Sequence, residues 1–146
     1  VMQSHCRIGH EILSGRGAME STMRSAFVML LGLGDQQASN PILDRAAEIA
    51  LSHHERWDGR GYPRALEGEA IPLSGRIVAV ADVFDALTSV RSYKPAMAVD
   101  EAVQLMRMDR GRHFEPAVLD AFLRVLPQAE ATRRRLGDEV IRRGVA

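Results

Sequence analysis

The feature that most constrains this chain is a pair of adjacent histidines, His53 and His54, at the end of an apolar helical pattern. Residues 41–57 place apolar side chains at helical spacing, and Asn40 followed by Pro41 is typical of a helix N-cap and first turn. Two neighbouring imidazoles are costly in an ordinary core, because their ring nitrogens need polar partners. The pair therefore favours a metal centre over simple packing.

A second apolar helix is predicted further along the chain, with Ser74 as its cap. Its apolar residues are so dense that we expect this helix to be central in the fold. Asp82 and Asp85 are three residues apart and share one face of it. A buried carboxylate is expensive when unpaired, so Asp82 is expected to be hydrogen-bonded, protonated or bound to a metal.

The segment between these helices is predicted to be a loop, since Gly61 and Pro63 interrupt any helical pattern. Two aromatic residues of this region, Trp57 and Tyr62, can either stack on a purine base or pin the loop to the core. The residues alone leave both interpretations open.

A short basic segment follows the second helix. Arg91 and Lys94 are three residues apart, so both cations can face one side, as binding of a phosphate requires. The alternative is a pair of solvated surface charges.

These segments together resemble the later part of the HD-GYP family. The resemblance rests on HHERWDGRGYP at residues 53–63, DVFDALTS at 82–89 and RSYK at 91–94. It implies an all-α, HD-domain-like helical bundle with two or three metal ions in the complete domain, often Fe or Mn. It also implies hydrolysis of cyclic di-GMP, or a related cyclic dinucleotide, to a linear dinucleotide or GMP.

The resemblance also assigns roles to individual residues, matched motif by motif. The implied metal ligands are His5, His53, His54 and Asp82, and Asp85 would orient ligands or substrate. Tyr62, Arg91 and Lys94 would form the substrate rim, and the loop motif itself is Gly61, Tyr62 and Pro63. We expect the loop to be a surface for a diguanylate cyclase domain as well.

The chain departs from the family pattern at its beginning. The name-giving His-Asp pair and further ligands should precede His5, so the bundle is expected to be incomplete on its N-terminal side, as in a fragment of a longer protein. Residues 1–146 are interpreted as one domain, with an insertion at 14–40 that offers a homodimer surface and a C-terminal helix at 127–146.

Composition excludes several other classes. Lys plus Arg and Asp plus Glu each number 19, so the formal net charge is zero, without the basic field typical of duplex nucleic-acid binders. No apolar run approaches the roughly 20 residues of a membrane span, and the first residues do not have a signal-peptide layout. We therefore predict a cytoplasmic protein with no duplex nucleic-acid partner.

Three remaining residues are given ordinary roles. Cys6 has no second cysteine and is interpreted as inert filler. His10 is expected to be solvated, and His113 to be structural or exposed. The functional alternatives are a metal-dependent cyclic dinucleotide phosphodiesterase, a non-catalytic cyclic dinucleotide receptor, and a partner-binding module that uses the loop motif.

Overall fold

The structure is a computed structural model that describes residues 4–14, 29–30, 40–90, 95–132 and 135. Over these residues the protein is all-α, as predicted, and its pairing of extended segments is limited to two isolated β-bridges. The helices are α1 (Ser4–Ser14), α3 (Pro41–Ser52), the short 3₁₀ helix η1 (Gly68–Ala70), α4 (Leu73–Thr88), α5 (Val99–Met108) and α6 (Pro116–Arg124).

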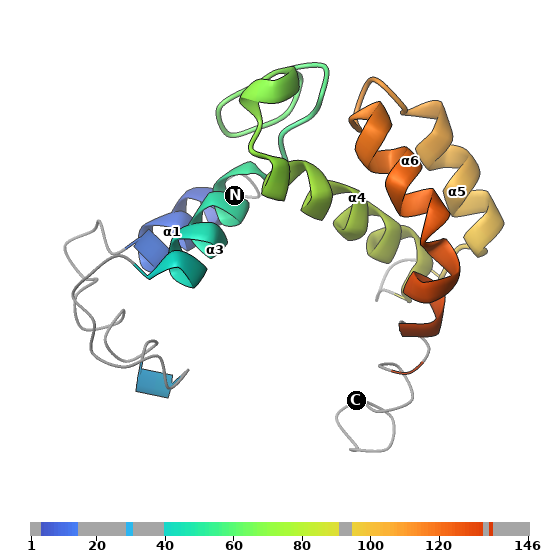
Figure 1. The fold of residues 1–146 in the computed structure, drawn as a ribbon, viewed down its shortest axis with the longest axis horizontal. Coiled ribbons are helices and arrows are strands. Elements are labelled where there is room, and N and C mark those ends of the chain that lie inside the picture. The colour runs from blue at the N-terminus through green and yellow to red at the C-terminus, as the bar shows by residue number, and fades with distance from the viewer. Residues whose placement is uncertain (1–3, 15–28, 31–39, 91–94, 133–134, 136–146) are drawn as a thin grey trace.

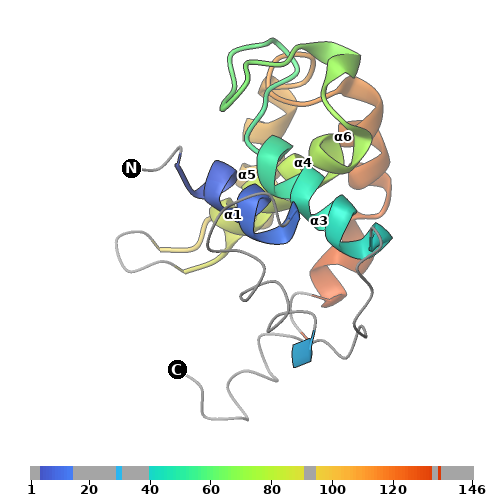
Figure 2. The same cartoon turned by 90° about the vertical axis from the view of Figure 1, so that its left-hand side faces the viewer.

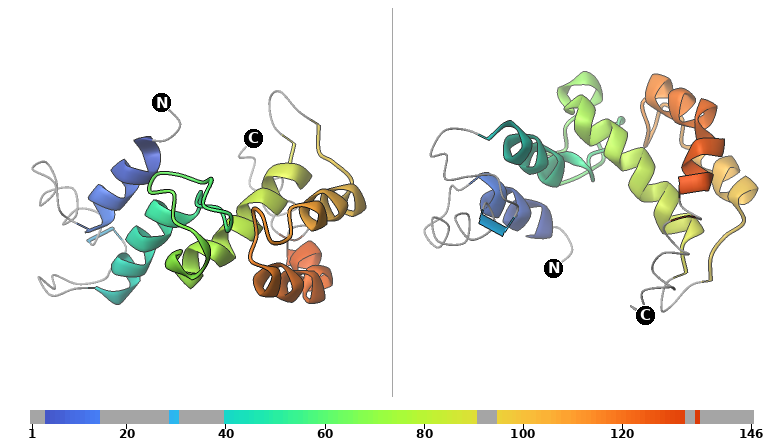
Figure 3. Two further views of the ribbon diagram at one scale, coloured as in Figure 1. Left: turned by 90° about the horizontal axis from the view of Figure 1, so that it is seen from above. Right: turned by 60° about the horizontal axis from the view of Figure 1, so that its bottom comes forward.

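The helices form two groups joined by α4 (Figure 1). At one end α1 packs against α3, and α3 packs against α4. At the other end α5 and α6 both pack against α4 (Figure 3). The long loop between α3 and α4 lies beyond the ends of these two helices, where Figure 2 shows it above the α1–α3 pair. The predicted central position of the α4 helix is confirmed by these contacts.

Helix α3 begins as the sequence predicts. The Asn40 side-chain oxygen accepts hydrogen bonds from the backbone N–H groups of Ile42 (3.0 Å) and Leu43 (3.4 Å), and Pro41 occupies the first turn. This cap satisfies donors that have no partner within the helix. Leu43 and Ala47 then face the interior and are buried.

Helix α4 begins two residues earlier than predicted, and Ser74 does not cap it. The N-cap position is Pro72, which makes no side-chain capping bond. Ser74 lies within the first turn, and its hydroxyl donates to the carboxylate of Glu48 on α3 instead. Ser74 therefore lies past the N-cap position, and its hydroxyl makes a charge-assisted hydrogen bond to another helix.

The apolar core lies between α4, α5 and α6. Its buried members are Val80, Phe84, Met106, Phe114 and Leu119. The rings of Phe84 and Phe122 meet edge to face with centroids 5.1 Å apart, a favoured aromatic geometry.

Helices α3 and α4 approach each other closely where they meet. Gly75 on α4 is buried against Ser52, the last residue of α3, and a Cβ at Gly75 would overlap the Ser52 side chain. The Ser52 hydroxyl donates to the backbone carbonyl of Glu48. A glycine is therefore required for this approach of the two helices.

Two predicted segments fall largely outside the described residues. Of the predicted insertion at 14–40, the structure describes only residue 14, residues 29–30 and residue 40. Of the predicted C-terminal helix at 127–146, residues 127–132 are helical and 135 is in a helix, and the others are not described. Within the described part of the chain, no helix has the length and apolar character that crossing a bilayer requires.

Candidate metal centre

Three histidines from two helices come together at one end of the α1–α3 pair. His5 comes from α1, and His53 and His54 follow the last turn of α3. The ring centroids are 5.7 Å apart for His5 and His53, 5.1 Å for His5 and His54, and 4.1 Å for His53 and His54. With the Cys6 thiol, these residues offer donor atoms that all lie within 4.8 Å of one another, so the group could hold a metal ion.

The packing of α1 on α3 brings His5 to the histidine pair. Gly9, one turn after His5, faces Ala50, and even a Cβ at Gly9 would be only 3.4 Å from the Ala50 Cβ. His10 Nδ1 lies 3.1 Å from the backbone carbonyl oxygen of Ala47 on α3. The expectation that His10 is solvated is therefore wrong, because its ring is half-buried against α3.

A hydrogen bond to the backbone orients the His53 ring. Its Nδ1 lies 2.9 Å from the carbonyl oxygen of Ile49, one turn earlier in α3. If Nδ1 carries the proton of this bond, Nε2 keeps a free lone pair. Metal-binding histidines in proteins are commonly held by such a bond from the second ring nitrogen.

Burial affects the protonation of His54. Desolvation is the largest cause that lowers the pKa of His54, the nearby His53 lowers it further, and the charge of Asp82 opposes both. A lowered pKa keeps the imidazole neutral at neutral pH, which is the form that binds a metal.

The two acidic residues of α4 lie differently with respect to the histidines. Asp82 is half-buried, and its charge acts on both His54 and Tyr62, although it is not among the four residues whose donor atoms group together. Asp85 is exposed, and its carboxylate accepts a hydrogen bond of 2.8 Å from the Ser89 hydroxyl. The predicted roles of Asp82 as ligand and Asp85 as orienting group stay predictions.

The loop after the histidines is built around a buried carboxylate. Glu55, which is 2% exposed, accepts hydrogen bonds from the backbone N–H groups of Arg64 (2.8 Å) and Leu66 (3.0 Å). Gly61 lies directly against the backbone of Glu55, so that a Cβ there would be 2.5 Å from the Glu55 Cα. These contacts fold the loop back and place the Tyr62 ring 4.8 Å from the His54 ring.

A second set of contacts fixes the loop to the other end of the molecule. The backbone N–H of Trp57 donates to the carbonyl of His113 over 3.0 Å, and the Arg76 guanidinium lies 5.8 Å from the centre of the Trp57 ring. Arg56 binds Asp58 through two hydrogen bonds and lowers the pKa of Asp58 to about 2. Of the two interpretations of Trp57, these contacts favour pinning the loop.

Comparison with known protein families agrees with this geometry. The HD domain family matches residues 14–118. The chain belongs to the HD domain family. The predicted resemblance to the HD-GYP family is confirmed. One curated relative, named as a cyclic di-GMP phosphodiesterase, aligns with most of this chain.

Three comparisons illustrate the relationship. A cyclic di-GMP phosphodiesterase response regulator, RpfG, from Xanthomonas campestris pv. campestris is 47% identical over 130 residues, which is 89% of this chain and 29% of the relative. A cyclic di-GMP phosphodiesterase from Thermotoga maritima is 40% identical over 139 residues, or 95% of this chain and 32% of the relative. A crystal structure of a cyclic GMP-AMP specific phosphodiesterase of Vibrio cholerae matches with a TM-score of 0.50 at 22% identity, covering 87% of this chain and 33% of the other.

The last of these matches supports the predicted HD-domain-like fold. The HD domain described here spans less than a third of the length of the two curated relatives. His5 precedes the range that the family matches, whereas the histidine pair and Asp82 lie within it.

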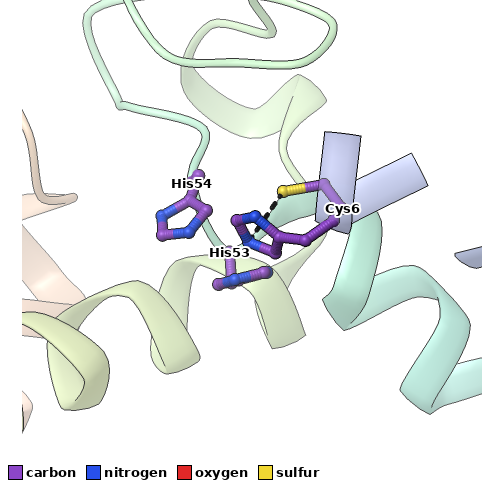
Figure 4. Close-up of side chains that lie close together, drawn as sticks. Cys6, His53 and His54 are labelled. Atoms are coloured by element: carbon purple, nitrogen blue, oxygen red, sulfur yellow. Dashed lines mark hydrogen bonds between the residues drawn. The ribbon is translucent and has the colours of Figure 1, made fainter. Parts of the chain in front are cut away.

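Cys6 is the member of this HD domain's histidine cluster that sequence reasoning missed. Its side chain is fully buried, and its Sγ lies 3.4 Å from His5 Nε2. Figure 4 shows the side chains of Cys6, His53 and His54 pointing toward one another. Burial is the largest cause that raises the pKa of the Cys6 thiol. The available signal was its position directly after His5, a predicted ligand.

Three other residues complete the account of the predicted site. Arg91 and Lys94, the predicted phosphate-binding cations, lie outside the described residues. His113 is half-buried and stacks on Phe114 with ring centroids 4.4 Å apart, which fits the structural role expected of it.

Proposed function

We propose that this HD domain carries part of the active site of a metal-dependent phosphodiesterase. The substrate would be cyclic di-GMP or a related cyclic dinucleotide, and the product a linear dinucleotide or GMP. The observation that carries the proposal is the convergence of His5, His53 and His54 from two helices. The relatives named as cyclic di-GMP phosphodiesterases support the choice of substrate.

The donors present fit a divalent metal ion. Three imidazoles lie close together, the orientation of His53 leaves one nitrogen for a ligand bond, and the lowered pKa of His54 keeps it neutral. Asp82 would add a carboxylate to this set. Imidazole and carboxylate ligands suit Fe and Mn, and two or three ions are expected in the complete domain. A bound ion would supply an acidic water and neutralise charge on the phosphoryl oxygens.

Groups beside the histidines would hold the substrate. Burial raises the pKa of Tyr62, so its phenol stays protonated at neutral pH and can donate a hydrogen bond to a phosphate oxygen. Its ring also presents a face for a base. Arg91 and Lys94 would bind the phosphate that does not react, and Asp85 would orient Asp82 or the substrate.

The partner predictions remain part of the proposal. In the loop motif, Pro63 and the following Arg64 are exposed and accessible to another protein, which supports a diguanylate cyclase contact at this surface. The homodimer surface at residues 14–40 and the cytoplasmic location rest on the sequence alone.

Hydrolysis and metal content of the purified protein test the proposal together. We expect the complete domain, with its preceding helices, to contain Fe or Mn and to convert cyclic di-GMP to the linear dinucleotide or GMP. His54→Ala should lower both the metal content and the rate, the rate by more than about a hundredfold, because even groups behind a ligand contribute ten- to a hundredfold.

His10→Ala is the matched control. His10 is on the same helix as His5 but contacts the Ala47 carbonyl, outside the donor group. It should retain metal and most of the activity. Tight binding of cyclic di-GMP without metal and without hydrolysis would favour a non-catalytic receptor over an enzyme. Full activity of His54→Ala would overturn the proposed site.

A further inference from the structure

The position of Cys6 is unusual for an inert buried cysteine. It is fully buried in α1 on the side that faces α3, while its neighbour His5 is exposed. Its sulfur is 3.4 Å from His5 Nε2, so the thiol is directed at a nitrogen that can itself bind a metal. Figure 4 shows the sulfur turned toward the rings of the cluster.

The distances suit one ion with four ligands. One donor atom from each of His5, Cys6, His53 and His54 lies within 4.8 Å of all the others. Around a tetrahedral Zn²⁺, with bonds of about 2.0–2.3 Å, neighbouring donors are roughly 3.3–3.8 Å apart. The most distant donors therefore need to approach one another by about 1.0–1.5 Å when an ion binds.

We infer that Cys6 is a metal ligand, which gives this HD domain a site with one thiolate and three imidazoles. The inference rests on the proposed metal centre and adds a donor that the family resemblance did not assign. As the sulfur–metal bond forms, the thiol proton passes to solvent, and the hydrogen bond between Cys6 and His5 is replaced by bonds from both residues to the ion.

A thiolate changes which metals the site prefers. Thiolate is a soft ligand that selects Zn²⁺ and similar ions, whereas Mn²⁺ prefers carboxylate and water oxygens. The presence of Cys6 should therefore raise the affinity of the histidine cluster for Zn²⁺ and Co²⁺ more than its affinity for Mn²⁺.

The simplest alternative is a packing cysteine whose thiol only holds the His5 ring. Cys6→Ser separates the two roles, because the serine hydroxyl can keep the hydrogen bond to His5 but is a poor ligand for a soft metal. Cys6→Ala removes both the bond and the ligand and serves as a second variant.

Titration of the metal-free protein with Co²⁺, followed by absorption spectroscopy, is the test. The native protein should show the visible d–d bands of bound Co²⁺ and an ultraviolet thiolate-to-Co²⁺ charge-transfer band. Cys6→Ser should lose the charge-transfer band and keep d–d bands, since the three histidines remain. X-ray absorption of the Zn²⁺-loaded native protein should place one sulfur about 2.3 Å from zinc.

The outcomes separate this inference from the proposed metal centre. Native d–d bands without a charge-transfer band would overturn the role of Cys6 and leave the histidine site intact. Absence of all Co²⁺ bands from the native protein would overturn both. Affinity gives an independent measure: Cys6→Ser should weaken Zn²⁺ binding at least about tenfold and Mn²⁺ binding much less, and equal losses for the two metals would contradict a thiolate ligand.

Discussion

The α1–α3 pair and the α4–α6 bundle differ in what fills the space between their helices. In the bundle, apolar side chains such as Phe84 and Leu119 are almost completely excluded from solvent. Among the described residues, α1 and α3 bury fewer apolar side chains than the bundle does, namely Cys6, Leu43 and Ala47. The end of this pair contains imidazoles where the bundle contains aromatic and aliphatic groups.

The difference indicates a division of roles. Apolar burial is the main source of folding stability, at about 25 cal/mol per Å², and the bundle contains most of it. Imidazoles brought together in a half-buried space cost stability unless their nitrogens find partners. The α1–α3 pair therefore has less apolar packing at the end that forms the metal centre. The bundle supports that end through α4.

The largest stability effect is expected from Leu119→Ala in the bundle. Leu119 is 0% exposed and packs in the apolar core, so its truncation should lower the free energy of unfolding by about 3 kcal/mol through lost burial and a cavity. Chemical denaturation measures this. Leu105→Ala on α5, where the side chain is 44% exposed, is the control and should cost under about 1 kcal/mol. Equal losses would contradict the assignment of the core to the α4–α6 interface.

Metal binding should act on the opposite end of the molecule. At a free metal concentration roughly 100 times Kd, a metal that binds only the folded state adds about 2.7 kcal/mol. Hydrogen exchange should show this gain mainly as protection of α1 and α3, with little change in α5 and α6. Chelation should reverse it. Uniform protection of all helices would mean that the two ends unfold as one unit.

The junction between the two ends is tested by Gly75→Ala. The new methyl group would overlap the Ser52 side chain and push α3 from α4, so we expect a loss of about 2 kcal/mol and weaker metal binding. Ser52→Gly should cost about 1 kcal/mol alone but should recover part of the loss in the double variant. A double variant whose losses simply add would show that the overlap with Ser52 is relieved elsewhere.

Local chemistry accounts for what the sequence predicts well. Asn40 caps α3 as expected because its partners, Ile42 and Leu43, are only two and three residues away. The same local rule fails at Ser74, because its hydroxyl meets Glu48, which is 26 residues distant in sequence. Ser74 also lies inside the first turn of α4, because the helix begins at Leu73, and the local pattern does not give that start.

The candidate site shows the same limit. The pairing of His53 with His54 is local, but the approach of His5 was predicted only through the family resemblance. Cys6 was missed and His10 was assigned to solvent because both depend on how α1 is rotated against α3. In the structure that rotation buries Cys6 and brings His10 to the Ala47 carbonyl. The apolar residues Ile8 and Ile12 do not indicate which face of α1 packs on α3, because both side chains are substantially exposed in the structure.

The smallest expected effect is a pH dependence contributed by His113, whose ring stacks on Phe114 of the core. Burial is the largest cause that lowers the pKa of His113, followed by the charge of Arg56. The unfolded chain therefore takes up this proton first as the pH falls. Stability is unaffected well above the ordinary histidine pKa of about 6.5 and decreases below it. We expect a loss of no more than about 1 kcal/mol between about pH 7.5 and about pH 5.5.

Denaturation of metal-free protein at the two pH values should show a smaller loss of stability in His113→Gln than in the native protein. Because burial lowers the pKa of His54 too, part of the dependence should persist in that variant. A pH response unchanged by His113→Gln would place all of it at the α1–α3 end.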